Sequence, residues 1–250
     1  MIVGAHIRGD KPLEEAKQVG AACLQMFVGE PQSWKKPPPR PDAAELAAAD
    51  IPIYVHAPYL INVASPNNRV RIPSRKILAG ALERSAEIGA TGLIVHAGHA
   101  EDDIERGFNR WRKVFEEMDE CPVRILIENT AGGNNAMGRY VEVIARLWPF
   151  VEEYNVGFCF DTCHAHAAGE DLSDVVERVL EATGGIDLVH ANSSRDAAGS
   201  GADRHANFAD GQLAPEAILA MVKASGAPAV ICETPWPGIE DDIAYLEENL

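Results

Sequence analysis

The feature that most constrains the fold is a regular alternation of short apolar segments with longer amphipathic ones. Eight apolar segments have the length of a β-strand, at residues 2–6, 22–28, 51–56, 92–97, 123–129, 156–161, 186–192 and 228–234. Amphipathic segments such as 74–90, 104–118 and 215–226 lie between them and have the period of helices. Strands that alternate with helices pair in parallel, and eight such units close a barrel. The sequence therefore predicts an α/β fold, a single-domain (β/α)8 TIM barrel over residues 1–250.

The remaining features of the chain agree with one intracellular domain. A length of 250 residues suits one barrel, and the proline-rich segment 35–41 is expected to be a rigid loop after the second strand. No apolar run of about 20 residues could span a membrane, and the start lacks the pattern of a signal peptide. The five cysteines are odd in number and form no C-x-x-C motif, which indicates reduced, mostly buried thiols. We expect a cytoplasmic monomer.

Titratable residues end six consecutive predicted strands. The third to eighth strands end on or beside His56, His96, Glu128, Asp161, His190 and Glu233. The carboxyl ends of the strands converge on one face of a (β/α)8 barrel, where active sites are built. Three more candidates follow in the loops, namely His164, three residues after Asp161, and Asp203 and His205 in the sequence DRH.

A lone histidine or carboxylate at a strand end is most often a satisfied polar residue. Six in succession differ, because four carboxylates in one mouth would repel one another and take up protons unless cations were present. Imidazoles and carboxylates without cysteine are ligands that borderline cations such as zinc accept. Nine ligands exceed the three or four of one catalytic zinc, so the sequence predicts two or three divalent ions.

The net charge of −16 counts against a nucleic-acid partner. Three bound divalent ions would bring it to roughly −10. The charge is also segregated, because residues 67–76 hold four basic residues and no acid, and residues 33–40 hold three. Acidic residues gather in 101–105, 116–120 and the last eleven positions, which we expect to be solvated surface. A local basic track therefore stays compatible with the acidic total.

At this point several motifs resemble those of endonuclease IV, the apurinic/apyrimidinic endonuclease family within the xylose-isomerase-like barrels. They are GAH (4–6), HAPYLIN (56–62), IENTAG (127–132), FDTCHAHAAGEDL (160–172), DRHANF (203–208) and ICET (231–234). They span nearly the whole chain in the order of the family. The resemblance implies a zinc-dependent DNA repair enzyme that hydrolyses the phosphodiester bond 5′ to an abasic site and leaves a 3′-hydroxyl. It also implies removal of 3′ blocking groups from duplex DNA.

The resemblance further implies three zinc ions per chain. Glu128 would be the catalytic residue and would bridge two ions, one of them also held by His56 and His96. Asp161, His190 and Glu233 would complete the second ion. His164, Asp203 and His205 would hold the third. All nine positions carry the residue type that the family has there.

The resemblance also implies how DNA is held. Tyr59 and Leu60 match the family's aromatic-aliphatic wedge, which enters the duplex at the lesion; local packing of the pair is the alternative. The chain departs from the family at Gln32, before Trp34, where the best-known members have arginine. It departs again at Ala97, where they have proline. Both departures concern DNA insertion and leave the metal ligands intact.

Several other polar residues have two readings. His99 and His166 closely follow candidate ligands and either donate hydrogen bonds to them or lie in exposed loops. His6 ends the first strand and is a candidate phosphate contact. Arg195 and Arg204 are candidate phosphate contacts too, although surface charge is the default interpretation.

The main alternative function is a metal-dependent sugar isomerase or epimerase of the same superfold. Such enzymes resemble the chain at Glu128, Asp161, His190 and Glu233, which would hold one metal for proton or hydride transfer on a ketose. They have no use for the other five candidate ligands together. A non-catalytic metal-binding or DNA-binding protein is less favoured, because structural sites do not need an open barrel mouth.

Overall fold

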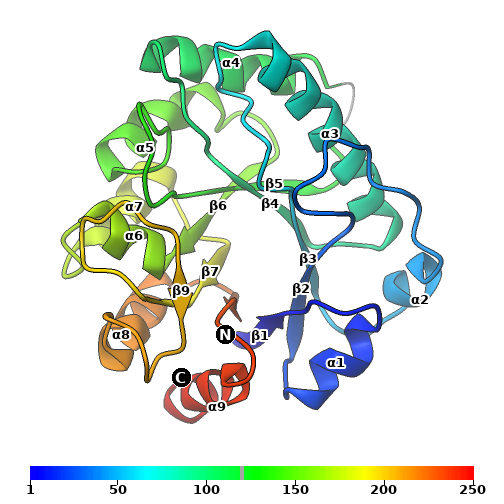
Figure 1. The fold of residues 1–250 in the computed structure, drawn as a ribbon, viewed down its shortest axis with the longest axis vertical. Helices are drawn as coiled ribbons and strands as arrows, with labels where there is room; N and C mark the ends of the chain where they lie inside the picture. The colour runs from blue at the N-terminus through cyan, green and yellow to red at the C-terminus, as the bar shows by residue number, and fades with distance from the viewer. Residues whose placement is uncertain (119–120) are drawn as a thin grey trace.

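The computed structural model describes residues 1–118 and 121–250 of the chain. Eight parallel strands close a barrel in the order β1-β10-β7-β6-β5-β4-β3-β2 (Figure 1). They are β1 (Ile2–His6), β2 (Cys23–Phe27), β3 (Ile53–His56), β4 (Gly92–His96), β5 (Arg124–Glu128), β6 (Val156–Asp161), β7 (Leu188–His190) and β10 (Ala229–Cys232). Each strand lies within its predicted segment, so the predicted (β/α)8 barrel is confirmed. The last strand ends at Cys232, one residue before Glu233.

Helices surround the barrel on the outside (Figure 1). They are α1 (Pro12–Gln18), α2 (Ala43–Ala47), α3 (Asn68–Glu87), α4 (Ile104–Glu116), α5 (Val141–Leu147), the 3-10 helix η1 (Trp148–Phe150), α6 (Thr162–Ala168), α7 (Val175–Thr183), α8 (Pro215–Ser225) and α9 (Ile239–Asn249). Helix α4 buries Phe108 and Trp111, and the Trp111 indole donates to the Ala97 carbonyl at 2.8 Å. The apolar faces of the helices thus cover the strands and form the outer core.

Helix α3 begins six residues earlier than the predicted segment 74–90. The Asn67 side chain caps it, accepting a hydrogen bond from the Arg69 amide at 2.9 Å. Pro73 lies inside the helix and has no amide to donate to the preceding turn. The cap at Asn67 satisfies an otherwise free amide at the start, which favours the longer helix. The basic segment 67–76 therefore forms the first turns of α3.

The interior of the barrel is filled in layers. One layer is apolar and consists of Cys23, Tyr54, Ile94, Leu126, Cys159, Leu188 and Ile231, all buried, with Ala229 one level below Ile231 on the same strand. Side chains on a strand alternate between its faces, so the residue two positions further along also points inward. Two positions beyond Tyr54, Ile94 and Leu126 are His56, His96 and Glu128. The period of the strands therefore places a polar layer directly above the apolar one.

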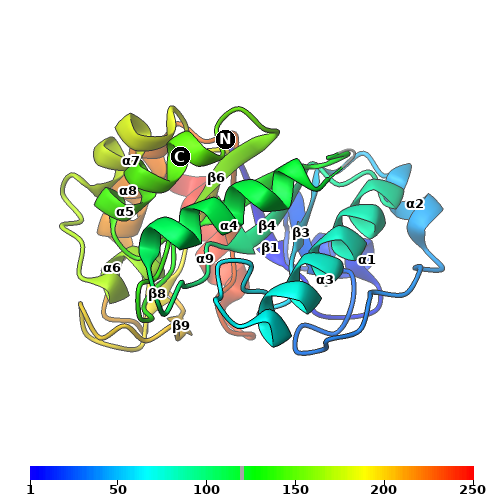
Figure 2. The same cartoon turned by 90° about the horizontal axis from the view of Figure 1, so that it is seen from above.

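A small antiparallel hairpin stands apart from the barrel strands. Strand β8 (Ser193–Ser194) pairs with β9 (His205–Ala206), and Ser194 lies opposite His205. In Figure 2 the hairpin lies with the loops at one end of the barrel. An ion pair between Arg204 and Asp196 and a hydrogen bond from Arg195 Nε to the His205 carbonyl at 3.0 Å hold its loop. No predicted segment corresponds to this hairpin.

The other expectations concern chemistry and exposure. All five cysteines lie in the described residues, are free, and four of them are buried. Among the described residues, no helix has the length and apolar character needed to cross a membrane. The acidic segment 116–120 is described only in part, because residues 119 and 120 lie outside the described residues.

Candidate metal centre

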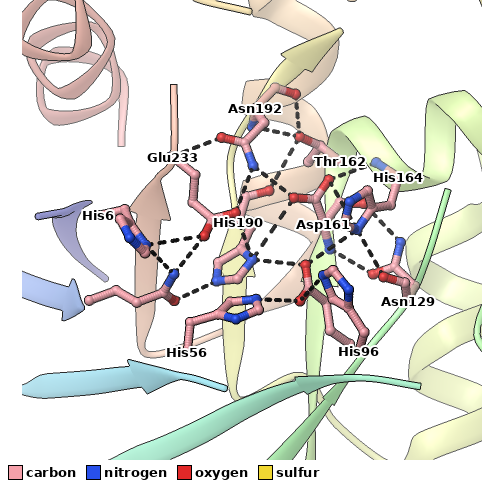
Figure 3. Close-up of polar contacts among 12 residues, drawn as sticks. His6, His56, His96, Asn129, Asp161, Thr162, His164, His190, Asn192 and Glu233 are labelled. Atoms are coloured by element: carbon pink, nitrogen blue, oxygen red, sulfur yellow. Dashed lines mark hydrogen bonds and ion pairs between the residues drawn. The ribbon is translucent and has the colours of Figure 1, made fainter. Parts of the chain in front are cut away.

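The polar layer at the mouth of the barrel gathers the nine candidate ligands. Six of them come from strand ends, His164 comes from α6, and Asp203 and His205 come from the hairpin loop and β9. Figure 3 shows histidine and carboxylate side chains from several strands pointing toward one another. Strand pairing sets their positions, since His96 lies opposite Glu128 and Asp161 lies opposite His190. The side chains thus converge because their strands are in register.

Glu128 is the centre of the first group. It is 0% exposed, and its Oε2 lies 3.2 Å from His56 Nε2 and 3.3 Å from His96 Nε2. These three side chains offer ligand atoms that all lie within 4.8 Å of one another. The geometry is that of a compact three-ligand site.

A second group shares Glu128. The ligand atoms of Glu128, Asp161, His190 and Glu233 also lie within 4.8 Å of one another. His190 Nδ1 is 3.0 Å from Glu128 Oε1 and 3.2 Å from Glu233 Oε2. Glu128 therefore offers one carboxylate oxygen to each group, as a bridging ligand does.

The third group forms where the hairpin returns over the barrel. Asp203 Oδ1 lies 3.1 Å from His164 Nε2 and 3.2 Å from His205 Nε2. His164 also forms a compact set with His96 and Asp203. His205 forms another with Asp161 and Cys163. Burial raises the pKa of the Cys163 thiol to about 12, which disfavours the thiolate that a metal ligand requires.

Backbone contacts fix which nitrogen of each imidazole faces the carboxylates. His56 donates from Nδ1 to the Ala57 carbonyl at 2.7 Å, and His164 donates from Nδ1 to the Asn129 carbonyl at 2.9 Å. Each ring then presents the lone pair of Nε2 to the site. Histidine ligands of metals are held in this way by a hydrogen bond from the opposite nitrogen.

Asp161 combines a structural and a site role. Its Oδ1 caps α6 by accepting from the His164 amide at 2.6 Å. Its Oδ2 accepts from the Asn192 side chain at 2.7 Å and lies 3.9 Å from His190 Nδ1. The cap fixes the rotation of the carboxylate, so the second oxygen is aimed at the other ligands.

The titratable groups of the polar layer shift one another's pKa values. Burial opposes ionisation of Glu128, but the imidazoles of His96 and His190 outweigh it and hold the pKa of the carboxyl well below its usual range. Burial raises the pKa of Asp161, and the neighbouring Glu128 charge adds to the effect. Burial also lowers the pKa of His96 to about 4, so this ring is neutral. Burial opposes protonation of His164 and His190, but the neighbouring acidic groups outweigh it and hold both pKa values well above the usual range. Divalent cations would have to displace these protons, because metal ligands must be deprotonated.

Two buried nitrogens provide a direct test of the donor set. His164 Nε2 and His205 Nε2 are buried and have no hydrogen-bond partner among the described residues. Both lie close to Asp203 Oδ1, but a carboxylate oxygen only accepts, so it gives no hydrogen bond to a nitrogen that presents its lone pair. A buried unpaired nitrogen costs roughly 1–3 kcal/mol. Nitrogen and oxygen ligands with free lone pairs fit divalent cations such as zinc.

The centre lies at the base of a cleft of about 1330 Å³. Tyr59 lines it and is 50% exposed, with its ring centroid 5.4 Å from that of His56 and 5.9 Å from that of His96. Leu60 is half-buried beside it, and Gln32 is exposed. The Tyr59 amide donates to the Pro31 carbonyl at 3.0 Å, which joins the loop of Gln32 to that of Tyr59. The three residues considered for DNA therefore lie on connected loops.

The other polar candidates divide into three cases. His6 lines the cleft and lies 3.5 Å from Glu233 Oε1, so it faces the mouth as expected. His166 donates to the Asp196 carbonyl at 3.0 Å and supports the hairpin loop rather than a ligand. The His99 side chain is 43% exposed and pairs with Glu101, so of its two readings the structure supports the exposed loop residue.

Both arginines near the hairpin line the cleft. Arg204 is engaged with Asp196, and its Nε donates at 2.8 Å. Arg195 uses only Nε for the His205 carbonyl, as described above. Arg195 therefore retains donors for an anion, whereas Arg204 fixes the loop.

Sequence reasoning missed four polar residues that hold the ligands in place. They are Gln25, Asn129, Thr162 and Asn192. Each is buried, and each lies in or beside a strand run that otherwise reads as apolar. An uncharged polar residue inside such a run was the available signal, because burial of an amide requires partners.

Comparison with known proteins gives consistent results. Residues 13–249 match the profile of the xylose isomerase-like TIM barrel family. The curated protein "Probable endonuclease 4" of Mycobacterium bovis (strain BCG / Pasteur 1173P2) is 56% identical over 251 residues, covering 100% of this chain and 99% of the relative.

Two solved structures have nearly the same fold similarity to this chain but different sequence identity. Endonuclease IV from Thermus thermophilus matches with a TM-score of 0.82 and 30% identity, covering 99% of this chain and 100% of that one. A D-tagatose 3-epimerase-like protein matches with a TM-score of 0.81 but 20% identity, covering 100% and 97%. The barrel alone therefore does not distinguish the two classes, and the sequence does.

Proposed function

This chain belongs to the xylose isomerase-like TIM barrel family and, within it, to the endonuclease IV proteins, and on that premise we propose that it is a DNA repair endonuclease. The resemblance noted in the sequence motifs is thereby confirmed. The proposed reaction is hydrolysis of the phosphodiester bond 5′ to an abasic site, which leaves a 3′-hydroxyl. The proposed substrate is duplex DNA with abasic sites or 3′ blocked ends. We propose that the protein acts as a monomer in the cytoplasm.

The observation that carries the proposal is the third group of ligands. A one-metal epimerase centre needs only the second group, which includes Glu128. His164, Asp203 and His205 would have no function in such a centre. We assign the three groups to three zinc ions, with Glu128 shared by the first two. Zinc held there supplies a nucleophile at neutral pH and neutralises charge on the phosphoryl group.

The residues of the chain contribute position and exclusion of water. Glu128 and Asp161 are fully buried, so the reacting phosphate would meet preorganised groups in a site of low dielectric constant. Arg8 and Arg195 lie on the wall of the cleft, where cationic side chains bind the phosphate backbone. The same lining holds Asp10, Glu30 and Asp42, so these arginines would act as individual phosphate contacts rather than through a net positive charge of the cleft.

Activity on two substrate classes tests the proposal. The zinc-loaded protein is expected to cut a duplex oligonucleotide with one abasic analogue and to leave the undamaged duplex intact. A panel of ketoses, incubated with the same sample, is expected to be unchanged. Epimerisation of a ketose without incision would replace the proposal with the sugar-enzyme alternative.

Metal content is the first quantitative prediction. Nine ligands in three groups should retain about three divalent ions per chain, mostly zinc, since the donors are nitrogen and carboxylate oxygen. Elemental analysis after exhaustive dialysis against metal-free buffer measures the ratio. An active sample with one ion per chain would contradict the three-ion assignment.

The second prediction is that substitutions of Tyr59 and Leu60 have different effects, because only Tyr59 contacts candidate metal ligands. Leu60→Ala should weaken binding to an abasic duplex by about 10-fold, because a side chain that fills the gap recovers part of the cost of unstacking. It should leave hydrolysis of a small activated phosphodiester unchanged. Tyr59→Ala should impair both activities, because its ring packs against His56 and His96.

The ratio of the two activities in each variant is the decisive measurement. Equal losses of both activities in Leu60→Ala would assign that residue to support of the barrel mouth. An unchanged affinity for the abasic duplex would place the wedge elsewhere.

A further inference from the structure

Gln25 occupies the β2 position in the polar layer. It lies two residues after Cys23, a member of the apolar layer, and it is 0% exposed. His6 lies opposite it on β1. From the third strand onward, the corresponding positions carry the candidate ligands. Strand β2 thus contributes a neutral amide to a layer of imidazoles and carboxylates.

The contacts of Gln25 determine the orientation of its amide. Nε2 lies 2.6 Å from Glu233 Oε1, and Oε1 lies 2.7 Å from His190 Nε2. An ionised carboxylate only accepts hydrogen bonds, so the group facing Glu233 must be the NH₂. The carbonyl oxygen therefore faces His190, and it accepts a hydrogen bond from Nε2–H of that ring.

This contact decides which nitrogen of His190 is free. With its proton on Nε2, the ring presents the lone pair of Nδ1, which lies 3.0 Å from Glu128 Oε1 and 3.2 Å from Glu233 Oε2. Backbone carbonyls do the same for His56 and His164, but from the opposite nitrogen. His190 receives this contact from the Gln25 side chain, so a single substitution can remove it.

The same amide restrains two further groups. By donating to Oε1 of Glu233, it leaves Oε2 directed at His190 Nδ1. Its second N–H points to His6 Nδ1 at 2.8 Å, which makes that nitrogen the acceptor. The proton of a neutral His6 ring is then on Nε2, the nitrogen left to donate into the cleft.

We propose that Gln25 is a positioning residue of the metal centre, which holds His190 and Glu233 in the orientation and tautomer that one ion needs. The proposal rests on the metal centre assigned above. Gln25 itself binds no metal, because both ends of its amide are engaged by protein groups. Removal of such a supporting contact typically weakens metal affinity by about 10- to 100-fold.

The test compares Gln25→Met with the parent, both loaded with zinc. Methionine keeps the unbranched shape but removes the donor and the acceptor. Titration with a chelator should show one ion bound about 10- to 100-fold more weakly, with the other ions retained. Cobalt substitution should change the visible absorption spectrum of that site. Zinc should also raise the Tm of the metal-free variant less than that of the parent.

Ser85→Ala is the matched control. Ser85 is buried in α3 and its hydroxyl donates only to the Ala81 carbonyl at 2.7 Å. Its loss should lower Tm without changing chelator resistance. Gln25→Leu repeats the test with a second apolar side chain. Zinc retention in both Gln25 variants equal to the parent would overturn the role of Gln25 alone, whereas a parent without zinc would overturn the metal centre as well.

Discussion

Glu128→Gln is expected to slow incision of an abasic duplex by at least about 1,000-fold, or roughly 4 kcal/mol of transition-state stabilisation. The two oxygens of Glu128 face different groups, with Oε2 near His56 and His96 and Oε1 near His190. Glutamine keeps the volume but replaces one oxygen with a donor and removes the charge. Two proposed ions are then disturbed by one substitution. Single-turnover rates, measured beside the metal content of the same sample, check the result.

Glu170→Gln provides the control for Glu128. Glu170 is also poorly exposed, but it pairs with Arg178 and accepts from the Val141 amide at 2.9 Å, away from the ligand groups. Its substitution should lower Tm and leave incision near the parent rate. A Glu128→Gln variant that retains its metals and cuts at the parent rate would contradict the bridging role.

His205→Ala is expected to slow incision by at least about 100-fold, because loss of one group that stabilises developing charge commonly has that effect. His205 stands on the hairpin, and its Nε2 lies 3.2 Å from Asp203 Oδ1 and 3.7 Å from Asp161 Oδ2, so its removal should affect the third group most and the second group less. Metal analysis should show loss of one ion and retention of the other two. The effect should therefore be smaller than that of Glu128→Gln.

His99→Ala is the matched histidine control. His99 pairs with Glu101 at the surface and contacts none of the nine ligands in the described structure. Its loss should leave rate and metal content unchanged. If His205→Ala kept all its metal and lost little activity, the assignment of His205 to a third ion would be wrong.

The fold could be predicted from the sequence because the hydrophobic periods of strands and helices differ. Eight apolar runs fixed the number and order of the barrel strands, and each observed strand lies inside its run. The ends of individual helices and strands were harder to predict. The early start of α3 depends on the side chain of Asn67, and Glu233 falls just outside β10 because the last strand pairing involves Cys232.

The candidate ligands were accessible because titratable residues are rare inside apolar runs. All nine lie around one mouth, as expected from the carboxyl ends of parallel strands. Gln25 was not accessible by the same reasoning, since it lies two residues before the end of β2 and carries no charge. The partners of His99 were not accessible either, because they depend on how the loop after β4 turns. Gly98 shapes that turn with a φ of 71°, and its backbone approaches Asn62 closely.

The origin of the ligands on two kinds of element bears on how such a centre evolves. Five ligands end barrel strands, Glu233 directly follows β10 and His164 lies on α6, whereas Asp203 and His205 depend on the hairpin of β8 and β9. Loops tolerate insertion and deletion far better than barrel strands do. Shortening of residues 195–204 in a descendant would remove the third ion position and leave the first two in place. Barrels with a two-ion centre and barrels with a three-ion centre would then differ by the length of a single loop.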